Sequence, residues 1–168
     1  LCYGVGFHLP ERSPRAAPEL WRQGVLSNLG GAGFCVAEFI ERLAAQEGAQ
    51  GQVVFLLTAL GEEYTDPLTE VTRAGFLALA RSSEVNDKSL RISAAVALSG
   101  PLPGSGAERT LRAIARMEGV EWERFLRHWK RRYEAELSTD PEALARAVAD
   151  FAQGRRGGVK ENLLRIGG

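Results

Sequence analysis

The chain alternates between short, uninterrupted apolar runs and longer segments in which apolar residues recur every three or four positions. Three apolar runs have the length of strands: 1–7, 52–59 and 90–98. The run at 52–59 has no polar alternation, which is typical of strands buried on both faces of a parallel sheet. The helical spacing predicts four helices, with the third interrupted near Gly119: 19–45, 68–83, 108–136 and 141–154. A last short strand is predicted over 159–166.

Strands that alternate with helices of crossover length indicate an α/β fold with a mainly parallel sheet. A chain of 168 residues is long enough for one domain with its own core. We therefore expect a single domain over residues 1–168, in which 108–136 forms a lid-like helical insertion.

The charge balance is even, with 21 Lys and Arg residues against 21 Asp and Glu residues. A net charge of zero removes the bulk attraction that nucleic acid or an anionic membrane would need. The longest apolar run is also far shorter than the roughly 20 residues that cross a bilayer. Only two cysteines are present, Cys2 and Cys35, which favours a reducing compartment, the cytoplasm, over a disulfide framework.

Two local motifs suggest chemistry that their surroundings do not support. Residues 25–33 lead into a helix like a dinucleotide-binding turn, and two glycines fit, but Val36 stands at the third glycine position. The strand that follows ends at Thr58 with no acidic residue for a ribose hydroxyl. His8 and His128 have no second ligand at metal-binding spacing, so we expect no metal site.

The predicted helix over 108–136 contains a basic run and an aromatic stripe. The basic run comprises Arg127, His128, Lys130, Arg131 and Arg132. Nearby glutamates offset it, so a solvated helix face is the simplest interpretation, and an acidic or phosphate-bearing partner such as a coenzyme A tail is the alternative. The aromatic stripe comprises Trp122, Phe125, Leu126 and Trp129, and indicates either core packing or an interface anchor.

The order of several segments resembles the short-chain dehydrogenase/reductase (SDR) family from its fourth strand onward. The segments that carry the resemblance are the following: 1–6, where the family has Leu-Val-Asn-Asn-Ala-Gly; Trp21 with Asn28 and 29–32, similar to its fifth helix; 51–58, similar to the strand that ends in the catalytic serine; 69–75, where the family has Tyr-x-x-x-Lys-Ala-Gly; 90–101; and 138–168. The resemblance implies a partial Rossmann-like three-layer sandwich that lacks the N-terminal, cofactor-binding strands.

The resemblance also implies where the catalytic residues would stand. In active members a tyrosine transfers the proton, a lysine lowers the pKa of that tyrosine and holds the ribose, and a serine polarises the carbonyl. Thr69, Arg73 and Thr58 stand at these three positions, and only Asn28 matches the family's residue. A threonine hydroxyl is a weak acid, and arginine differs from lysine in reach and shape. We therefore expect none of the four residues to be catalytic and none to bind a cofactor.

These substitutions lead to a functional hypothesis. We expect a non-catalytic, SDR-like pseudoenzyme subunit that supports a full-length, active SDR, with NAD(P) bound by that partner in a hetero-oligomer such as a dimer of dimers. In the family, the segments present here form the main oligomer interfaces. The apolar start at Leu1 would be an open sheet edge, so we expect a preceding segment or another chain to cover it. The two-subunit hydroxybenzylsuccinyl-CoA dehydrogenase, with one inactive subunit, is a family precedent and implies a hydroxyacyl-CoA substrate.

Two alternatives stay open. One is a catalytic SDR whose NAD(P)-binding half lies outside this sequence. The other is a self-assembling module that binds a small ligand under the helices of residues 100–136.

Overall fold

The computed structural model describes residues 1–4, 6, 17–60, 64–86, 88–133, 139–155, 159–160 and 162–166. His8, with most of the predicted loop around it, lies outside the described residues, as do residues 61–63 and 134–138.

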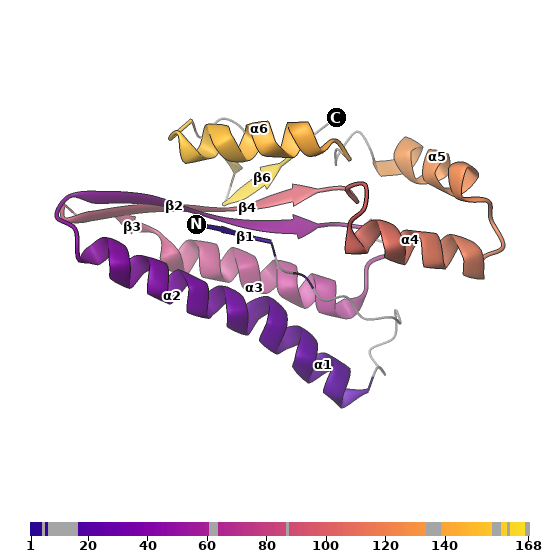
Figure 1. Ribbon diagram of the computed structural model, residues 1–168, viewed down its shortest axis with the longest axis horizontal. Coiled ribbons are helices and arrows are strands. Elements are labelled where there is room, and N and C mark those ends of the chain that lie inside the picture. Colours follow the sequence, from indigo (N-terminus) through magenta and orange to yellow (C-terminus); the bar gives the residue numbers. More distant parts are fainter. Residues whose placement is uncertain are drawn as a thin grey trace.

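A mainly parallel sheet forms the centre of the molecule (Figure 1). Its two long strands, β2 (Ala49–Thr58) and β4 (Leu90–Ser99), pair in parallel along their whole length. On the outer sides, β1 (Cys2–Tyr3) is parallel to β2 and β6 (Leu163–Arg165) is parallel to β4, while β5 (Val159–Lys160) runs antiparallel to β6. The predicted α/β class with a mainly parallel sheet is confirmed.

Helices cover both faces of this sheet and its carboxyl end (Figure 1). One face carries α1 (Pro18–Val25), the π-helical turn η1 (Leu26–Gly30), α2 (Gly31–Ala44) and α3 (Pro67–Ser83). The opposite face carries α6 (Pro141–Ala152). The helices α4 (Gly106–Met117) and α5 (Trp122–Tyr133) lie beyond the carboxyl ends of β2 and β4, and residues 118–121 separate them near the predicted interruption.

Several predicted elements differ in detail. The predicted strand over 1–7 is strand only at Cys2–Tyr3; Gly4 and Gly6 are not in a strand, and Val5 and Phe7 lie outside the described residues. The predicted last strand is divided into β5 and β6 because Asn162, with φ of 62°, forms a turn between them. The predicted helix over 19–45 contains η1, and the short strand β3 (Val85–Asn86), antiparallel to β4, was not predicted.

The two faces of the sheet have separate cores. On the α2–α3 face, Phe55 of β2 stacks on Phe76 of α3 with ring centroids 5.1 Å apart. Gly75 lets α3 approach η1 closely, since a Cβ atom there would lie 2.5 Å from the Leu29 side chain. On the other face, Val54 and Phe151 belong to the core under α6.

A third core joins α4 and α5. Phe125, Trp129 and Tyr133 of α5 are buried together with Leu60 and Leu111, so the aromatic stripe predicted on this helix is core packing. The Trp129 indole Nε1 donates a hydrogen bond of 2.6 Å to the Leu60 carbonyl, which ties α5 to the chain just after β2.

Candidate functional site

Three of the four predicted site residues lie together at the carboxyl end of the sheet. Asn28 of η1, Thr58 at the end of β2 and Thr69 of α3 line a cavity of about 140 Å³. Thr72 of α3, the start of α4, the end of β2 and the glycines that follow β1 also line it. Arg73, the fourth predicted residue, does not line this cavity.

Asn28 links two helices across the back of the cavity. Its side chain is buried, and its Nδ2 donates a hydrogen bond of 2.9 Å to Oγ1 of Thr72. The π-helical turn widens the helix at this point, a feature often found near functional sites. Sequence reasoning missed Thr72, although its position three residues after Thr69 puts both side chains on one face of α3.

Thr69 is held by the carboxylate that begins its own helix. Asp66 is the N-cap of α3, and its Oδ1 accepts the Thr69 backbone N–H at 3.0 Å. The Thr69 hydroxyl donates to the other oxygen, Oδ2, at 2.7 Å, and both residues are buried. The hydroxyl proton is thus directed at a carboxylate of the same chain rather than into the cavity. Asp66 was also missed, although an Asp before Pro67 is a helix-start signal.

Arg73 is engaged on the outer side of α3. Its Nε and Nη2 donate to Oε2 of Glu70 at 3.0 and 2.5 Å, in an ion pair that is about half exposed. The guanidinium therefore has a carboxylate partner one turn away on the same helix.

No tyrosine takes the place of the family's catalytic tyrosine among the residues that line the cavity. Tyr3 donates its hydroxyl to the Ser27 carbonyl at 2.7 Å. Burial, with a smaller contribution from Cys35, raises the pKa of the Tyr3 phenol and keeps it protonated. Tyr64 is buried near α5, with its ring centroid 5.2 Å from that of Phe125.

Comparison with known proteins identifies this architecture. No family model and no curated protein matches the chain. A crystal structure described as that of a "putative short-chain dehydrogenase/reductase" from Burkholderia xenovorans matches with a TM-score of 0.74 and 18% sequence identity. The chain has an SDR-like, Rossmann-type fold. The match covers 97% of this chain and 61% of that one, so the chain spans about three-fifths of the other protein's length.

The cavity at the carboxyl end of the sheet is small. Its volume of about 140 Å³ is below the roughly 300–1,000 Å³ that accommodates drug-sized ligands. The glycines of residues 30–33 do not form a phosphate-binding turn, because they lie inside η1 and α2. A Cβ atom at Gly31 would lie 2.5 Å from the Tyr3 hydroxyl oxygen, so this glycine serves close packing against β1.

Within the described ranges, no group of three or more His, Cys, Asp or Glu side chains is placed to hold a metal ion. In the same part of the chain, no helix is both long and apolar enough to cross a bilayer.

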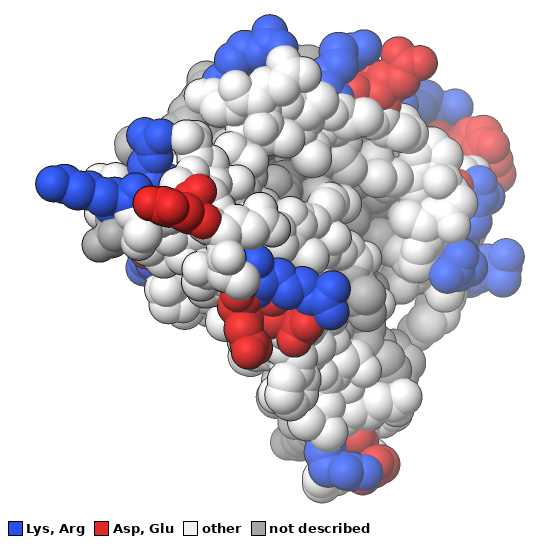
Figure 2. Space-filling model, turned by 60° about the vertical axis from the view of Figure 1, so that its left-hand side comes forward, with Lys and Arg blue, Asp and Glu red and all other residues white. Residues whose placement is uncertain are grey.

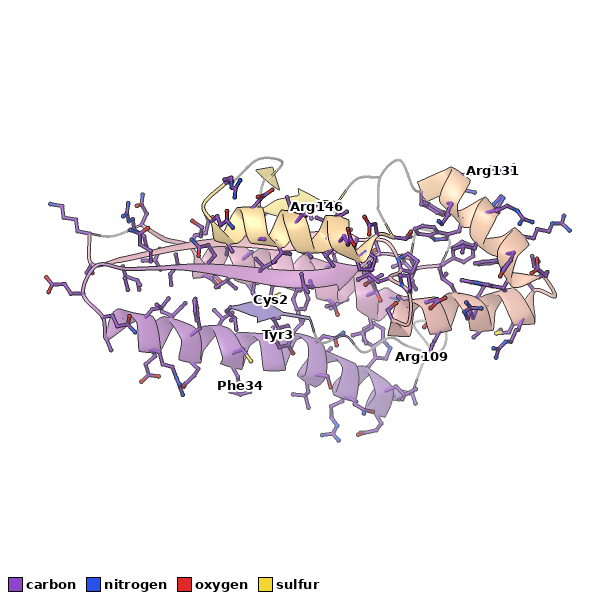
Figure 3. The ribbon with its side chains drawn as sticks, turned by 45° about the horizontal axis from the view of Figure 1, so that its top comes forward. Cys2, Tyr3, Phe34, Arg109, Arg131 and Arg146 are labelled. Carbon is purple, nitrogen blue, oxygen red and sulfur yellow. The ribbon has the colours of Figure 1, made fainter. Side chains whose placement is uncertain are left out.

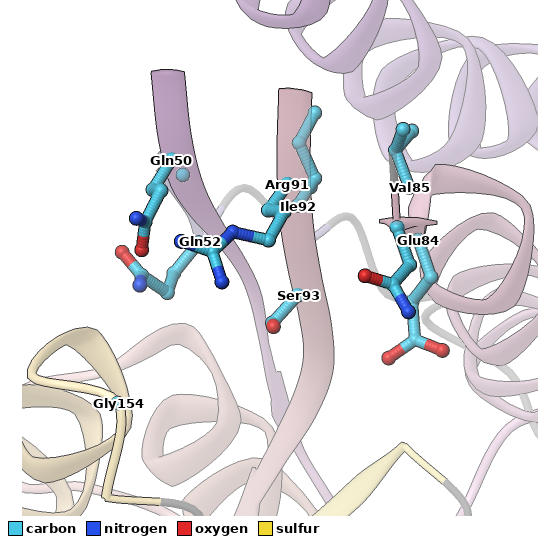
Figure 4. A pocket seen from close by; sticks show the side chains of 10 residues that line it. Gln50, Gln52, Glu84, Val85, Arg91, Ile92, Ser93 and Gly154 are labelled. Carbon is cyan, nitrogen blue, oxygen red and sulfur yellow. The ribbon is translucent and has the colours of Figure 1, made fainter. Parts of the chain in front are cut away.

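A larger cavity, of about 420 Å³, lies at the opposite end of the SDR-like sheet (Figure 4). Gln50 and Gln52 of β2 lie beside Arg91 and Ser93 of β4 in the strand register. Gly154, just after the end of α6, also lines this cavity, so the cavity extends to the end of that helix. Rossmann-like sheets bind ligands at the carboxyl ends of their strands, and this cavity lies at the amino ends.

Proposed function

We propose that this chain is a non-catalytic, SDR-like subunit that assembles with a full-length, active NAD(P)-dependent SDR and supports it. The observation that carries the proposal concerns Thr69 and Arg73, which stand where the family has its catalytic tyrosine and lysine. Thr69 donates its hydroxyl to Asp66, and Arg73 is paired with Glu70. Proton transfer needs a group of suitable pKa aimed at the substrate, and neither residue meets that requirement.

In this proposal the partner subunit binds the NAD(P). The small volume of the cavity at Asn28 and Thr58 supports this assignment. The expected role of the present chain is structural: it holds the partner in its active assembly or forms one wall of its substrate pocket.

The surface proposed to meet the partner is the helix layer of α1, η1, α2 and α3. Large exposed hydrophobic side chains gather there among the described residues: Val25, Leu26, Phe34 and Val71. Phe34 is 80% exposed and points away from the sheet (Figure 3). The solvent-facing side of a surface helix is normally polar, so a group of exposed aromatic and aliphatic side chains there indicates a protein contact. A partner of similar fold would present the corresponding helices, as subunits do in pseudo-symmetric dimers.

Two further features bear on the alternatives. The hydroxyls and amide of Thr58, Thr72 and Asn28 around one cavity favour, as a second candidate, a module that binds a small polar ligand. Both cysteines are exposed free thiols, which suits the reducing cytoplasm that we propose as the location.

Native mass spectrometry of the complex purified through a tag on this chain tests the proposal, with NAD(H) titrated in. We expect a second, longer polypeptide, and we expect every bound dinucleotide to remain with it after the subunits dissociate. A homo-oligomer of this chain that binds NAD(H) by itself would refute the proposal. A homo-oligomer that binds no dinucleotide would favour the small-ligand module.

A further inference from the structure

Helix α5 presents one face to the core and the other to solvent. Phe125, Trp129 and Tyr133 recur every four residues and are buried against α4. The hydrogen bond from Trp129 to Leu60 and the ring contact of Phe125 with Tyr64 fix the rotation of the helix about its axis. The residues on the opposite side are therefore held in a defined orientation.

That outer face is a row of basic side chains, which we call the α5 stripe: Arg124, Arg127, His128 and Arg131. Their spacing of three, four and seven residues places them in one row, and all four are exposed. Figure 3 shows Arg131 at the end of the molecule beyond the sheet.

Five arginines on the other helices are paired locally. Each forms an ion pair with a glutamate three or four residues before it: Arg22 with Glu19, Arg42 with Glu38, Arg73 with Glu70, Arg112 with Glu108, and Arg146 with Glu142. Arg81, Arg109 and Arg116 have no glutamate at that spacing. On the face drawn in Figure 2, some blue side chains lie directly beside red ones, others stand alone, and a broad uncharged surface separates these groups.

The α5 stripe departs from that arrangement. Within the described part of the chain, none of its four side chains has an ion pair. Glu121 lies three residues before Arg124 and Glu123 lies four before Arg127. The Glu121 carboxylate accepts the backbone N–H groups of Glu123 and Arg124 at the start of the helix instead of pairing with a guanidinium. Arg127 also has Arg131 four residues on, a pair of like charge. Such pairs destabilise a helix by a few tenths of a kcal/mol each.

The helix dipole explains only part of this stripe. Cations in the last turn of a helix are stabilising, which accounts for Arg131. Arg124 and Arg127 lie in the first half of α5, where the dipole opposes positive charge. Charges that oppose the helix dipole without a compensating ion pair are a local inconsistency of the kind expected at a functional site.

We propose that the α5 stripe binds the linked phosphates of a soluble ligand. A guanidinium donates paired hydrogen bonds to a phosphate, and three guanidiniums in one row can hold adjacent phosphates at the same time. Arg124 and Arg131 are seven residues apart, which is about 10 Å along the helix axis and matches two or three linked phosphates. This inference does not depend on the proposed partner subunit.

The test is isothermal titration calorimetry of the full chain with inorganic tripolyphosphate at low ionic strength. We expect saturable binding that weakens steeply with added salt, because the contacts are charge-assisted. The variant R124E/R127E should bind at least about tenfold more weakly, since two charge-assisted contacts are lost. The matched control is R22E/R42E, which changes the net charge equally on α1 and α2 and should bind within about twofold of the unchanged chain.

The variants also report on folding and on the source of the phosphate. Glutamates in the first half of α5 suit the helix dipole, so R124E/R127E should keep its helical circular dichroism, and the neutral R124Q/R127Q gives a second measurement. Nucleoside triphosphate that binds at least as tightly as tripolyphosphate supports the proposal. The proposal fails if tripolyphosphate does not saturate the unchanged chain, if the control loses as much affinity, or if only vesicles of anionic lipid bind.

Discussion

At the scale of single residues, the hydrogen bond between Asn28 and Thr72 is a buried polar link inside the helix layer. It joins η1 to α3 across 44 residues of sequence, and each residue is only 1% exposed. A buried donor that loses its acceptor keeps the full cost of its desolvation. This pair therefore contributes to the stability of the fold whether or not the cavity beside it binds a ligand.

We predict that Asn28→Ala lowers the free energy of unfolding by about 1–3 kcal/mol, because Thr72 loses a buried partner. Urea denaturation followed by circular dichroism measures this change. Thr72→Val in a double-mutant cycle should show coupling of at least about 0.5 kcal/mol. Ser82→Ala, which removes an exposed hydroxyl from the same helix α3, is the control and should change stability by less than about 0.5 kcal/mol. Additive effects of the two buried substitutions would contradict the prediction.

The resemblance to the SDR family was sufficient to expect Asn28, Thr58 and Thr69 at one site, and the structure places all three around one cavity. The resemblance was not sufficient to tell what their side chains do. Whether Thr69 faces the cavity or Asp66 depends on the rotation of a hydroxyl within the first turn of α3. Arg73 was expected beside the site because of its spacing from Thr69, but a carboxylate three residues earlier on the helix pairs with it.

At the scale of elements, length decides what the sequence predicts. The runs predicted over 52–59 and 90–98 became ten-residue strands with nearly the same ends, since long apolar runs carry their own signal. The two-residue strands β3 and β5 have too few residues for a pattern and exist only through pairing with β4 and β6. The π-helical turn η1 likewise differs from its flanking helices by geometry and not by composition.

The Glu108 side chain accepts a backbone hydrogen bond just before the start of α4. Its Oε2 accepts the Gly104 backbone N–H at 2.6 Å, and this bond, followed by the bond from Arg112, holds the pKa of the Glu108 carboxyl below its ordinary value. Because the pKa is lowered in the folded state, the Glu108 carboxylate stabilises the fold fully above the ordinary carboxyl pKa of about 4.3. The stabilisation is lost as the pH falls from there through the lower pKa of the folded protein.

We predict that Glu108→Gln lowers the free energy of unfolding at pH 7 by about 0.5–1 kcal/mol, a value typical of a lost helix cap at a partly exposed site. Below pH 4 the difference between variant and unchanged chain should shrink. Urea unfolding at both pH values measures it. The control Glu38→Gln removes an exposed ion pair with Arg42 on α2 and should have a smaller effect at pH 7. An equal loss at both pH values would contradict the assigned role of the carboxylate.

At the scale of the whole molecule, the proposed interface predicts how the chain assembles. Phe34→Asp should reduce capture of the partner subunit at least about tenfold in a tagged pull-down, because it places a charge in the centre of an apolar contact. Met117→Asp is the matched control, since Met117 on α4 is 86% exposed and lies outside the helix layer. Both variants should have unchanged melting temperatures as isolated chains. Equal capture by the two variants would place the interface elsewhere.

The parallel pairing of β2 with β4 also has a consequence for how the chain folds. The two strands contact each other along ten residues, yet all of α3 lies between them in sequence. The entropy of closing that long segment has to be overcome before any pairing is gained, so we expect folding in milliseconds to seconds rather than microseconds. During that interval β2, whose residues 53–57 are apolar on both faces, is not yet paired with β4. The partly folded chain is therefore more prone to aggregate than the native protein.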